Sequence, residues 1–164
     1  MLNIVLLEPE MPANTGNIGR TCCATGTRLH LIEPMGFKVN DKTLKRAGLD
    51  YWDKLDVTIY DCLEDFFGKN KEAIGTMFMA KKVYSEVAYP ENAYIMFGKE
   101  SAGIPEEVLV DYQETAVRIP MNEEIRSLNL SNSVAIVLYE ALRQNGFFSM
   151  QLGGELHRLH WKGN

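Results

Sequence analysis

Short apolar runs alternate with helical segments along most of this chain of 164 residues. Each run is bounded by turn-forming residues, which is typical of strands. The runs predict strands at residues 3–7, 28–32, 57–60, 76–79, 94–97 and 117–119. Strands that alternate with helices favour a parallel sheet, and the chain is therefore predicted to have an α/β fold.

The segments between these strands carry residues that start and stop helices. Helices are expected from residues 14–15 to Gly26, between Asp41 and Gly48, after Asp61, and at residues 105–110. In the last of these, Pro105 precedes Glu106 and Glu107, and this order suits the first turn of a helix. Internal repeats and low-complexity linkers are absent from the sequence.

A polar loop at residues 119–133 leads into the most amphipathic helix of the chain. Apolar residues recur with helical spacing over residues 134–142, so this helix is expected to bury one face. Ser131 or Asn132 is expected to cap it, and residues 145–146 to end it. Backbone N–H groups without helical partners converge at such a start, which suits a ligand site, although an ordinary capped loop has the same composition.

Length and cysteine usage indicate one domain in a reducing compartment. A chain of 164 residues can bury about two thirds of the surface that it exposes when unfolded. Cys22, Cys23 and Cys62 have neither a zinc spacing nor the spacing of a disulfide framework, so a cytoplasmic location is expected. The apolar start at residues 1–7 lacks a basic leader and is too short to span a bilayer, so no membrane partner is expected.

The charge balance is acidic, with two local basic segments. The net charge of −5 argues against a protein that is coated in nucleic acid. Basic residues nevertheless gather at residues 38–54 and again at residues 157–162. Each segment is either solvated surface or a local site for RNA phosphates.

Most common catalytic motifs are absent from the sequence. Gly16 and Gly19 do not form the glycine fingerprint of dinucleotide-binding proteins, and no phosphate-binding loop of the nucleotide-triphosphatase type occurs. His157 and His160 have a spacing that could reach one metal ion, but no thiol or paired carboxylates accompany them, and no metal is expected. His30 lies inside a predicted strand, so it is expected to be a packed histidine rather than a base.

Three loops that follow predicted strands are the best candidates for a site, because ligands of open α/β sheets bind beyond the carboxyl ends of the strands. These loops span residues 8–21, 97–105 and 119–133. Gly98 would let the backbone of its loop approach a ligand closely. Arg20, expected about one turn inside the first helix, could bind a phosphate through two parallel hydrogen bonds.

Together, these loops resemble the three sequence motifs of the SPOUT class of RNA methyltransferases. The motifs are NTGNIGR at residues 14–20, FGKESAGIP at 97–105, and IPM at 119–121 with RSLNLSN at 126–132. EPMGF at residues 33–37 and RAGLDYW at 46–52 are similar to a narrower branch of small bacterial enzymes, which 2′-O-methylate the ribose of the tRNA wobble nucleotide. The likeness covers about residues 1–148 and leaves residues 149–164 as an extra tail.

The resemblance implies one SPOUT methyltransferase domain over residues 1–164, with a parallel-sheet α/β-knot fold in which the C-terminal segment forms a deep trefoil knot. It also implies a homodimer and S-adenosylmethionine as the cofactor. By position, the cofactor-binding residues would be Met79, Gly98, Ile119, Met121, Ser127 and Leu128. Apolar walls with a few polar groups suit an adenine ring.

Arg20 matches the arginine to which the class assigns catalysis. A guanidinium is effectively always protonated, so its role is open between assisting deprotonation of the ribose hydroxyl and stabilising the alkoxide as a fixed cation. Glu100 and Asn129 match motif positions that would orient loops or substrate. The residues expected to contact the tRNA anticodon loop are Arg46 and Arg126, with Lys45, Tyr51 and Trp52 as further candidates.

The resemblance therefore predicts an S-adenosylmethionine-dependent 2′-O-methyltransferase for the ribose of the tRNA wobble nucleotide, position 34. One alternative is a ribose methyltransferase that acts on another tRNA position or on ribosomal RNA. A second alternative is an inactive SPOUT-fold protein that only binds RNA. A dinucleotide-dependent reductase is disfavoured because the glycine fingerprint is absent from the sequence.

Overall fold

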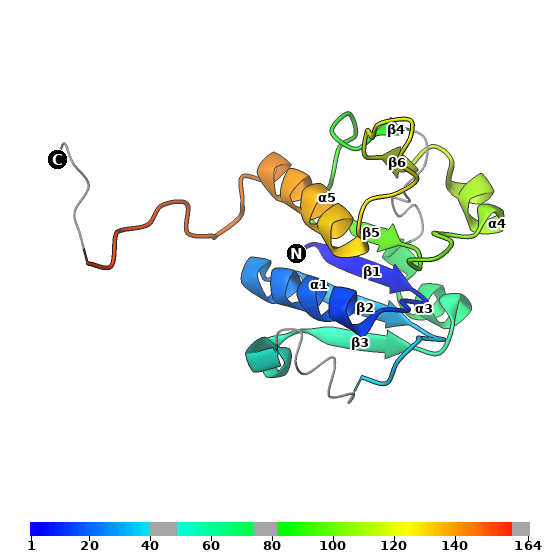
Figure 1. The fold of residues 1–164 in the computed structure, drawn as a ribbon, viewed down its shortest axis with the longest axis horizontal. Helices are drawn as coiled ribbons and strands as arrows, with labels where there is room; N and C mark the ends of the chain where they lie inside the picture. The colour runs from blue at the N-terminus through cyan, green and yellow to red at the C-terminus, as the bar shows by residue number, and fades with distance from the viewer. Residues whose placement is uncertain (40–48, 74–81, 159–164) are drawn as a thin grey trace.

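A parallel sheet forms the centre of the computed structural model, which describes residues 1–39, 49–73 and 82–158. The sheet runs in the order β3-β2-β1-β5 (Figure 1). Its strands are β1 (Asn3–Leu7), β2 (Arg28–Ile32), β3 (Val57–Tyr60) and β5 (Tyr94–Phe97). All neighbouring pairs are parallel, which confirms the predicted α/β sheet and these strand positions. The strand predicted at residues 76–79 and the helix predicted between Asp41 and Gly48 lie outside the described residues.

A second, smaller ladder stands apart from this sheet in the described part of the chain. It joins β4 (Lys82–Val83) to β6 (Val117–Arg118) in parallel. The strand predicted at residues 117–119 is therefore present but one residue shorter. β4 was not predicted, because two residues are too few to show strand periodicity.

Helices flank the sheet and begin and end close to the predicted residues. They are α1 (Pro12–Thr25), α3 (Leu63–Lys69), α4 (Glu106–Leu109) and α5 (Leu130–Gln144), with short 3₁₀ segments η1 (Leu49–Lys54), η2 (Lys71–Ala73) and η3 (Val110–Tyr112). Gly26 ends α1 in the left-handed region at φ 64°, as its role as a stop predicts. The predicted start of α1 at residues 14–15 was wrong, because Pro12 already occupies the first turn.

Asn129, rather than Ser131 or Asn132, caps α5. Its side-chain oxygen accepts hydrogen bonds from the backbone N–H of Ser131 at 2.9 Å and of Asn132 at 3.4 Å. The helix therefore begins at Leu130, earlier than the apolar stripe alone suggested. The predicted end at residues 145–146 is confirmed, with Asn145 as the C-cap.

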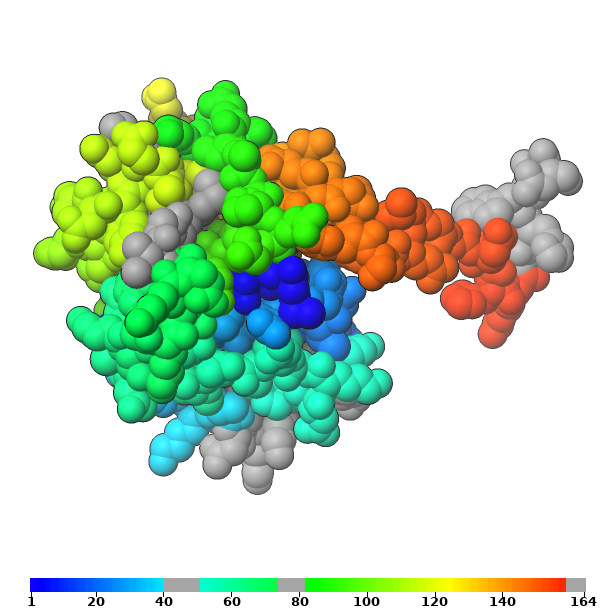
Figure 2. All heavy atoms as spheres, turned by 180° about the vertical axis from the view of Figure 1, so that it is seen from behind, coloured from blue at the N-terminus to red at the C-terminus, as the bar shows by residue number. Residues whose placement is uncertain are grey.

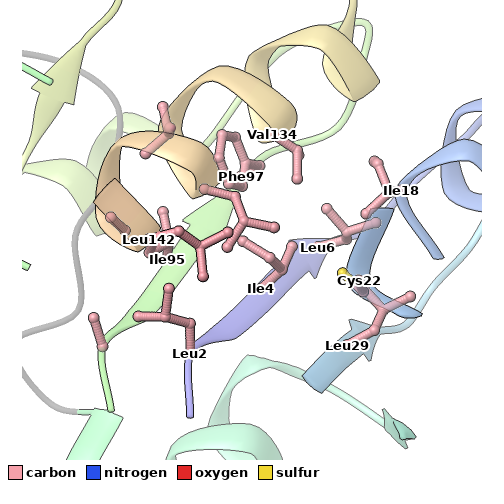
Figure 3. Packing of buried hydrophobic residues seen from close by; sticks show 14 of the residues in the cluster. Leu2, Ile4, Leu6, Ile18, Cys22, Leu29, Ile95, Phe97, Val134 and Leu142 are labelled. Carbon is pink, nitrogen blue, oxygen red and sulfur yellow. The ribbon is translucent and has the colours of Figure 1, made fainter. Parts of the chain in front are cut away.

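Two hydrophobic cores lie on opposite faces of the sheet, because successive side chains of a strand point to opposite sides. Ile4 and Leu6 of β1 pack beneath α1 and α5 on one face, where Ile18 and Val134 meet them (Figure 3). On the other face, Val5 and Leu7 pack with aromatic residues that include Phe66 of α3. The burial of β1 on both faces explains its continuous apolar sequence.

His30 is a packed residue of the second face, as predicted. Only 4% of its surface is exposed, and its ring stacks on Tyr60 at 5.7 Å between centroids. Nε2 lies 3.2 Å from the side-chain oxygen of Asn3, and Nδ1 lies 2.9 Å from the hydroxyl of Tyr60. Burial, the largest cause, lowers the pKa of His30 to about 4, so the ring is neutral near neutral pH.

The chain leaves the body of the molecule after α5. Met150 still packs against the core beneath α5, and residues 151–158 then extend away from the body without regular secondary structure (Figures 1 and 2). Leu152, which is 77% exposed, belongs to this segment. Among the described residues, no helix combines the length and apolar character needed to cross a membrane.

Candidate active site

The candidate site lies at the carboxyl ends of β1 and β5. These two strands are neighbours, and the chain order reverses between them, since β2 and β3 follow on one side of β1 and β5 lies on the other. A switch point of this kind opens a crevice in parallel sheets, because the two following loops turn away in opposite directions. A pocket of about 640 Å³ lies here, a size that suits a small-molecule ligand.

The structure brings the predicted motifs together around this pocket. Five of the six predicted cofactor residues line it, and they are Gly98, Ile119, Met121, Ser127 and Leu128. Glu100, Arg126 and Asn129, which were predicted to contact substrate or to orient loops, line the same pocket. Met79 and Arg46 lie outside the described residues, as does Lys45. Arg20 is exposed and is not among the described residues that line the pocket.

Gly98 is required by the fold of its own loop. A Cβ at this position would lie 2.0 Å from the carbonyl carbon of Gly103 and 2.1 Å from the backbone nitrogen of Ile104. Real Cβ atoms do not approach backbone this closely, and backbone cannot turn aside as a side chain can. Gly98 therefore lets the loop fold back on itself directly after β5, on the edge of the pocket.

A chain of hydrogen bonds connects the three motif loops. One carboxylate oxygen of Glu100 accepts from the backbone N–H of Glu10 at 2.8 Å, and the other accepts from the side-chain amide of Asn14 at 3.0 Å. The side-chain oxygen of Asn14 accepts from the amide of Asn129 at 3.0 Å, and Asn129 caps α5. Each amide thus donates on one side and accepts on the other, which fixes the positions of the loops relative to one another.

A second set of polar contacts ties the loop after β1 to the loop after β5. Lys99 donates to Glu8 at 2.9 Å, and this bond raises the pKa of Lys99. Glu10 accepts from the hydroxyl of Ser101 at 2.8 Å and from its backbone N–H at 2.9 Å. These hydrogen bonds, the hydroxyl first, lower the pKa of Glu10, so its carboxylate is charged near neutral pH.

Arg20 lies farther from the pocket than predicted. It is more than two turns inside α1 rather than one, because the helix begins at Pro12. Its guanidinium carbon lies 5.2 Å from the centre of the Tyr51 ring, over the ring face. Among the described residues, Arg20 makes no hydrogen bond or ion pair.

Tyr51 and Trp52 of η1 have different surroundings. Tyr51 is 40% exposed, whereas Trp52 is half-buried and packs against the core beneath α1. A Cβ on Gly19 would lie 3.4 Å from the Trp52 ring. Trp52 therefore attaches η1 to α1, and this packing disfavours its predicted role as a stacking platform for RNA bases.

Two residues contribute to the site without having been predicted to do so. Asn14 was noted only as part of a motif, yet its amide connects Glu100 to Asn129. Arg118 lines the pocket from β6 and was not predicted. The position of Arg118 between buried Val117 and Ile119 was a usable indication, because strand alternation turns it away from the core.

Comparison with known families matches residues 1–139 to the SpoU rRNA Methylase family. This match covers more than half of the chain, and it includes all three motif loops. The chain belongs to this family.

The similar proteins narrow the activity. The tRNA (cytidine(34)-2'-O)-methyltransferase of Escherichia coli (strain K12) is 47% identical over 150 residues, which cover 90% of this chain and 96% of the relative. A relative from Listeria innocua serovar 6a is 53% identical over 152 residues, 88% of this chain and 89% of the relative, and its name gives the same activity provisionally. The likeness therefore extends over nearly the whole of both relatives.

Solved structures agree with the family. A structure described as giving insights into the 2-OH methylation of C/U34 on tRNA superposes with a TM-score of 0.82 at 41% identity, covering 89% of this chain and 97% of the other. An S-adenosylmethionine complex of the SpoU methyltransferase AviRb from Streptomyces viridochromogenes, at 22% identity, has a TM-score of 0.75 and shares the fold. It covers 92% of this chain and 59% of the other. The parallel-sheet α/β fold is thus that of SpoU methyltransferases.

Proposed function

We propose that this protein transfers a methyl group from S-adenosylmethionine to the ribose 2′-oxygen of the tRNA wobble nucleotide, position 34. The observation that carries the proposal is the meeting of three motif loops around one pocket, joined through Glu100, Asn14 and Asn129. Relatives that are 46–47% identical along nearly their whole length are named for this reaction. The site and the relatives therefore support the same activity.

The residues of the pocket fit S-adenosylmethionine. Ile119, Met121 and Leu128 offer apolar walls for an adenine ring, and Gly98 lets the backbone come close. Ser127 adds a hydroxyl that has no hydrogen-bond partner among the described residues, so it is free for the ligand. When bound, the cofactor supplies a methyl group on a positively charged sulfur. Met79 is proposed as a further contact on the basis of the motif alone.

Arg20 is proposed as the catalytic residue through its fixed positive charge. A guanidinium stays protonated, so it would anchor the neighbouring phosphate and stabilise the ribose oxygen as negative charge develops there. The absence of hydrogen-bond partners for Arg20 among the described residues supports this role, since its donors are available. Correct alignment of the ribose oxygen with the methyl group supplies the remaining acceleration.

Arg126 is proposed to bind the anticodon loop. It lines the pocket and is exposed, and it has no ion-pair partner in the described part of the chain. Arg118, which is also exposed at the pocket, extends this cationic edge. Arginine suits phosphate contacts because its planar donors bind two oxygens at once. Arg46 remains a proposed tRNA contact on the basis of the motif.

The active enzyme is proposed to be a homodimer. Arg20 lies six residues beyond Asn14 on α1, a separation of about 9 Å along the helix axis, which places it away from the pocket of its own chain. A second copy would bring one Arg20 to the pocket of the other. Ile136 and Tyr139 are exposed apolar residues one turn apart on α5, and they offer a surface for that copy. Sedimentation velocity would test the dimer directly.

Three further features complete the proposal. One SPOUT domain spans residues 1–164, with residues 149–164 as its tail, and the exposure of residues 151–158 supports this division. A deep trefoil knot in the C-terminal segment is proposed on the basis of the family resemblance. The cytoplasm is the proposed compartment, in agreement with three free cysteine thiols.

The test is transfer of labelled methyl from S-adenosylmethionine to tRNA from a strain that lacks wobble ribose methylation. Nuclease mapping of the product locates the labelled nucleotide. We expect label at the 2′-oxygen of the wobble nucleotide, and a much slower but measurable rate of labelling with an Arg20→Ala variant that still binds the cofactor. Label at another tRNA position or on ribosomal RNA would replace the proposed substrate, and cofactor binding without any transfer would favour a protein that only binds RNA.

A further inference from the structure

Arg20 and Tyr51 form a contact between α1 and η1 that the proposed reaction does not by itself explain. The guanidinium carbon of Arg20 lies 5.2 Å from the centre of the Tyr51 ring, within the range of a cation–π interaction. No other polar contact of Arg20 occurs among the described residues. Among the described residues, the ring of Tyr51 is therefore the group that holds this side chain.

The backbone around Tyr51 is anchored by its neighbours rather than by Tyr51 itself. Trp52 packs against Gly19 of α1, and Leu55, just after η1, is buried in the core. The backbone N–H of Leu55 donates to the carbonyl of Trp52 at 3.1 Å, which closes the turn. Gly19 and Trp52 thus form a contact next to the core. Their sequence neighbours Arg20 and Tyr51 form a second contact, on the exposed surface.

A contact with an aromatic ring leaves the guanidinium available for recognition. The ring face offers no oxygen acceptor, so this contact at 5.2 Å commits none of the five N–H donors of Arg20 to a hydrogen bond with oxygen. A hydrogen bond to a carboxylate would instead use the donors that a phosphate needs. The contact with Tyr51 therefore restricts the side chain of Arg20 while it keeps the donors free.

We propose that Tyr51 is a positioning residue that holds the Arg20 guanidinium for a phosphate of the RNA substrate. This inference rests on the proposed function, since it assigns Tyr51 a part in the same reaction. Tyr51 acts through Arg20 by its ring and not by its hydroxyl. The ordering of Arg20 before the RNA binds lowers the entropy that is lost when the reactants align.

The experiment compares Tyr51→Leu with Tyr51→Phe, in the wild-type protein and in an Arg20→Ala background. Tyr51→Leu keeps apolar bulk but removes the ring, and we expect about a three- to tenfold loss of kcat with an unchanged KM for S-adenosylmethionine. Tyr51→Phe keeps the ring and should stay within about twofold of the wild type. In Arg20→Ala, the residual activity should not change further with Tyr51→Leu, because the partner is already absent.

Asp53→Asn is the matched control, because Asp53 is an exposed residue of the same 3₁₀ segment and makes no contact with the site among the residues that the structure describes. Its activity should equal that of the wild type. The melting temperature of every variant is measured as well, and an unchanged value excludes a merely structural loss. Equal losses from Tyr51→Leu in both backgrounds, or a loss from Tyr51→Phe as large as that from Tyr51→Leu, would overturn the proposal.

A measurement on the free protein separates this inference from the proposed function. The aromatic ring should shift the side-chain NMR resonances of Arg20 upfield, and Tyr51→Leu should remove the shift. Unshifted resonances in the wild type would refute the contact even if wobble methylation is found. If the shift is present but the wild type methylates no RNA, the positioning role is refuted together with the proposed function.

Discussion

Gly98 shows how strongly a single residue can be constrained at this site. An added Cβ would collide with the backbone of Gly103 and Ile104, at 2.0 Å and 2.1 Å, and neither backbone group can move without opening the loop after β5. We predict that Gly98→Ala weakens S-adenosylmethionine binding by more than about tenfold, because the loop forms one wall of the pocket. Isothermal titration calorimetry measures the change.

Gly68 provides the matched control for that substitution. It lies in α3, its φ is not in the left-handed region, and a Cβ there would meet no atom within 4 Å. Gly68→Ala should leave cofactor affinity unchanged and raise the free energy of unfolding by about 0.5–1 kcal/mol, since alanine favours helix. Equal affinities for the Gly98 and Gly68 variants would contradict the argument from the close approach of the backbone.

Thr15 carries a different kind of constraint. Its side-chain hydroxyl is buried and has no hydrogen-bond partner in the described part of the chain. Thr15→Val removes the unsatisfied hydroxyl and preserves the shape of the side chain, so the free energy of unfolding should rise by about 1 kcal/mol. The control is Thr25→Val, because the hydroxyl of Thr25 donates a hydrogen bond to the carbonyl of Thr21 at 2.9 Å. Loss of this hydrogen bond should destabilise the protein. Urea denaturation compares the two, and a destabilised Thr15→Val would indicate that the hydroxyl does have a partner.

At the scale of elements, the start of α5 combines folding with assembly of the site. Asn129 caps the helix through its oxygen and reaches Asn14 through its amide nitrogen. We predict that Asn129→Ala lowers the free energy of unfolding by about 1–2 kcal/mol, as expected for loss of an N-cap. Asn129→Asp keeps the capping oxygen, so it should be nearly as stable as the wild type and yet bind the cofactor more weakly, because the bond to Asn14 is lost.

Ser131→Ala is the control for the two Asn129 variants, and it should change neither the stability nor the cofactor affinity by as much as they do. The hydroxyl of Ser131 donates only to Asn129 at 2.6 Å, so its removal leaves the backbone cap and the bond to Asn14 intact. Denaturation with urea gives the stabilities, and calorimetry gives the cofactor affinities. Cofactor binding by Asn129→Asp as tight as that of the wild type would show that the amide contact does not position the pocket.

The helix boundaries also show where sequence reasoning about elements succeeds and fails. Gly26 was correctly predicted as a stop, because a left-handed residue after a helix favours glycine whatever surrounds it. The cap of α5 was misplaced, because Asn129, Ser131 and Asn132 are all good caps and only the bond to Asn14 distinguishes the first of them. Local preference gives a short list of candidates, and a contact 115 residues away in sequence makes the choice.

At the scale of the whole molecule, the position of the pocket followed from the order of elements. Parallel strands place the loops that follow them at one edge of the sheet, so the site was predicted in such loops, and the pairing of β1 with β5 brings two of them together. Arg20 was predicted about one turn inside the first helix, and its motif did not show that α1 begins earlier, at Pro12. The contact with Tyr51 was equally hidden, since η1 shows no periodic pattern and packs on α1 through Trp52.

The stability of the whole molecule should depend on pH through His30. Nε2 of His30 faces the side-chain oxygen of Asn3, so Nε2 carries the proton of the neutral ring. Nδ1 then accepts a hydrogen bond from the hydroxyl of Tyr60. Protonation of Nδ1 would break this bond, because Nδ1 could no longer accept it. The pKa of His30 is about 4 in the native state and 6.5 ordinarily. Between these values the unfolded chain binds a proton that the native state refuses, so stability is complete above about pH 6.5 and falls as the pH decreases toward 4.

The full decrease corresponds to about 3 kcal/mol, from roughly 1.4 kcal/mol for each unit of pKa difference. Urea denaturation between about pH 7 and pH 5 isolates the contribution of His30. The carboxylates become protonated, and lose their native contacts, mainly at lower pH. A His30→Gln variant should be less stable near pH 7, where its contacts with Asn3 and Tyr60 are impaired, but its stability should vary less over the same interval. If the free energy of unfolding changes equally with pH in the variant and in the wild type, other groups cause the pH dependence. The neutral, buried His30 would then not limit stability in mild acid.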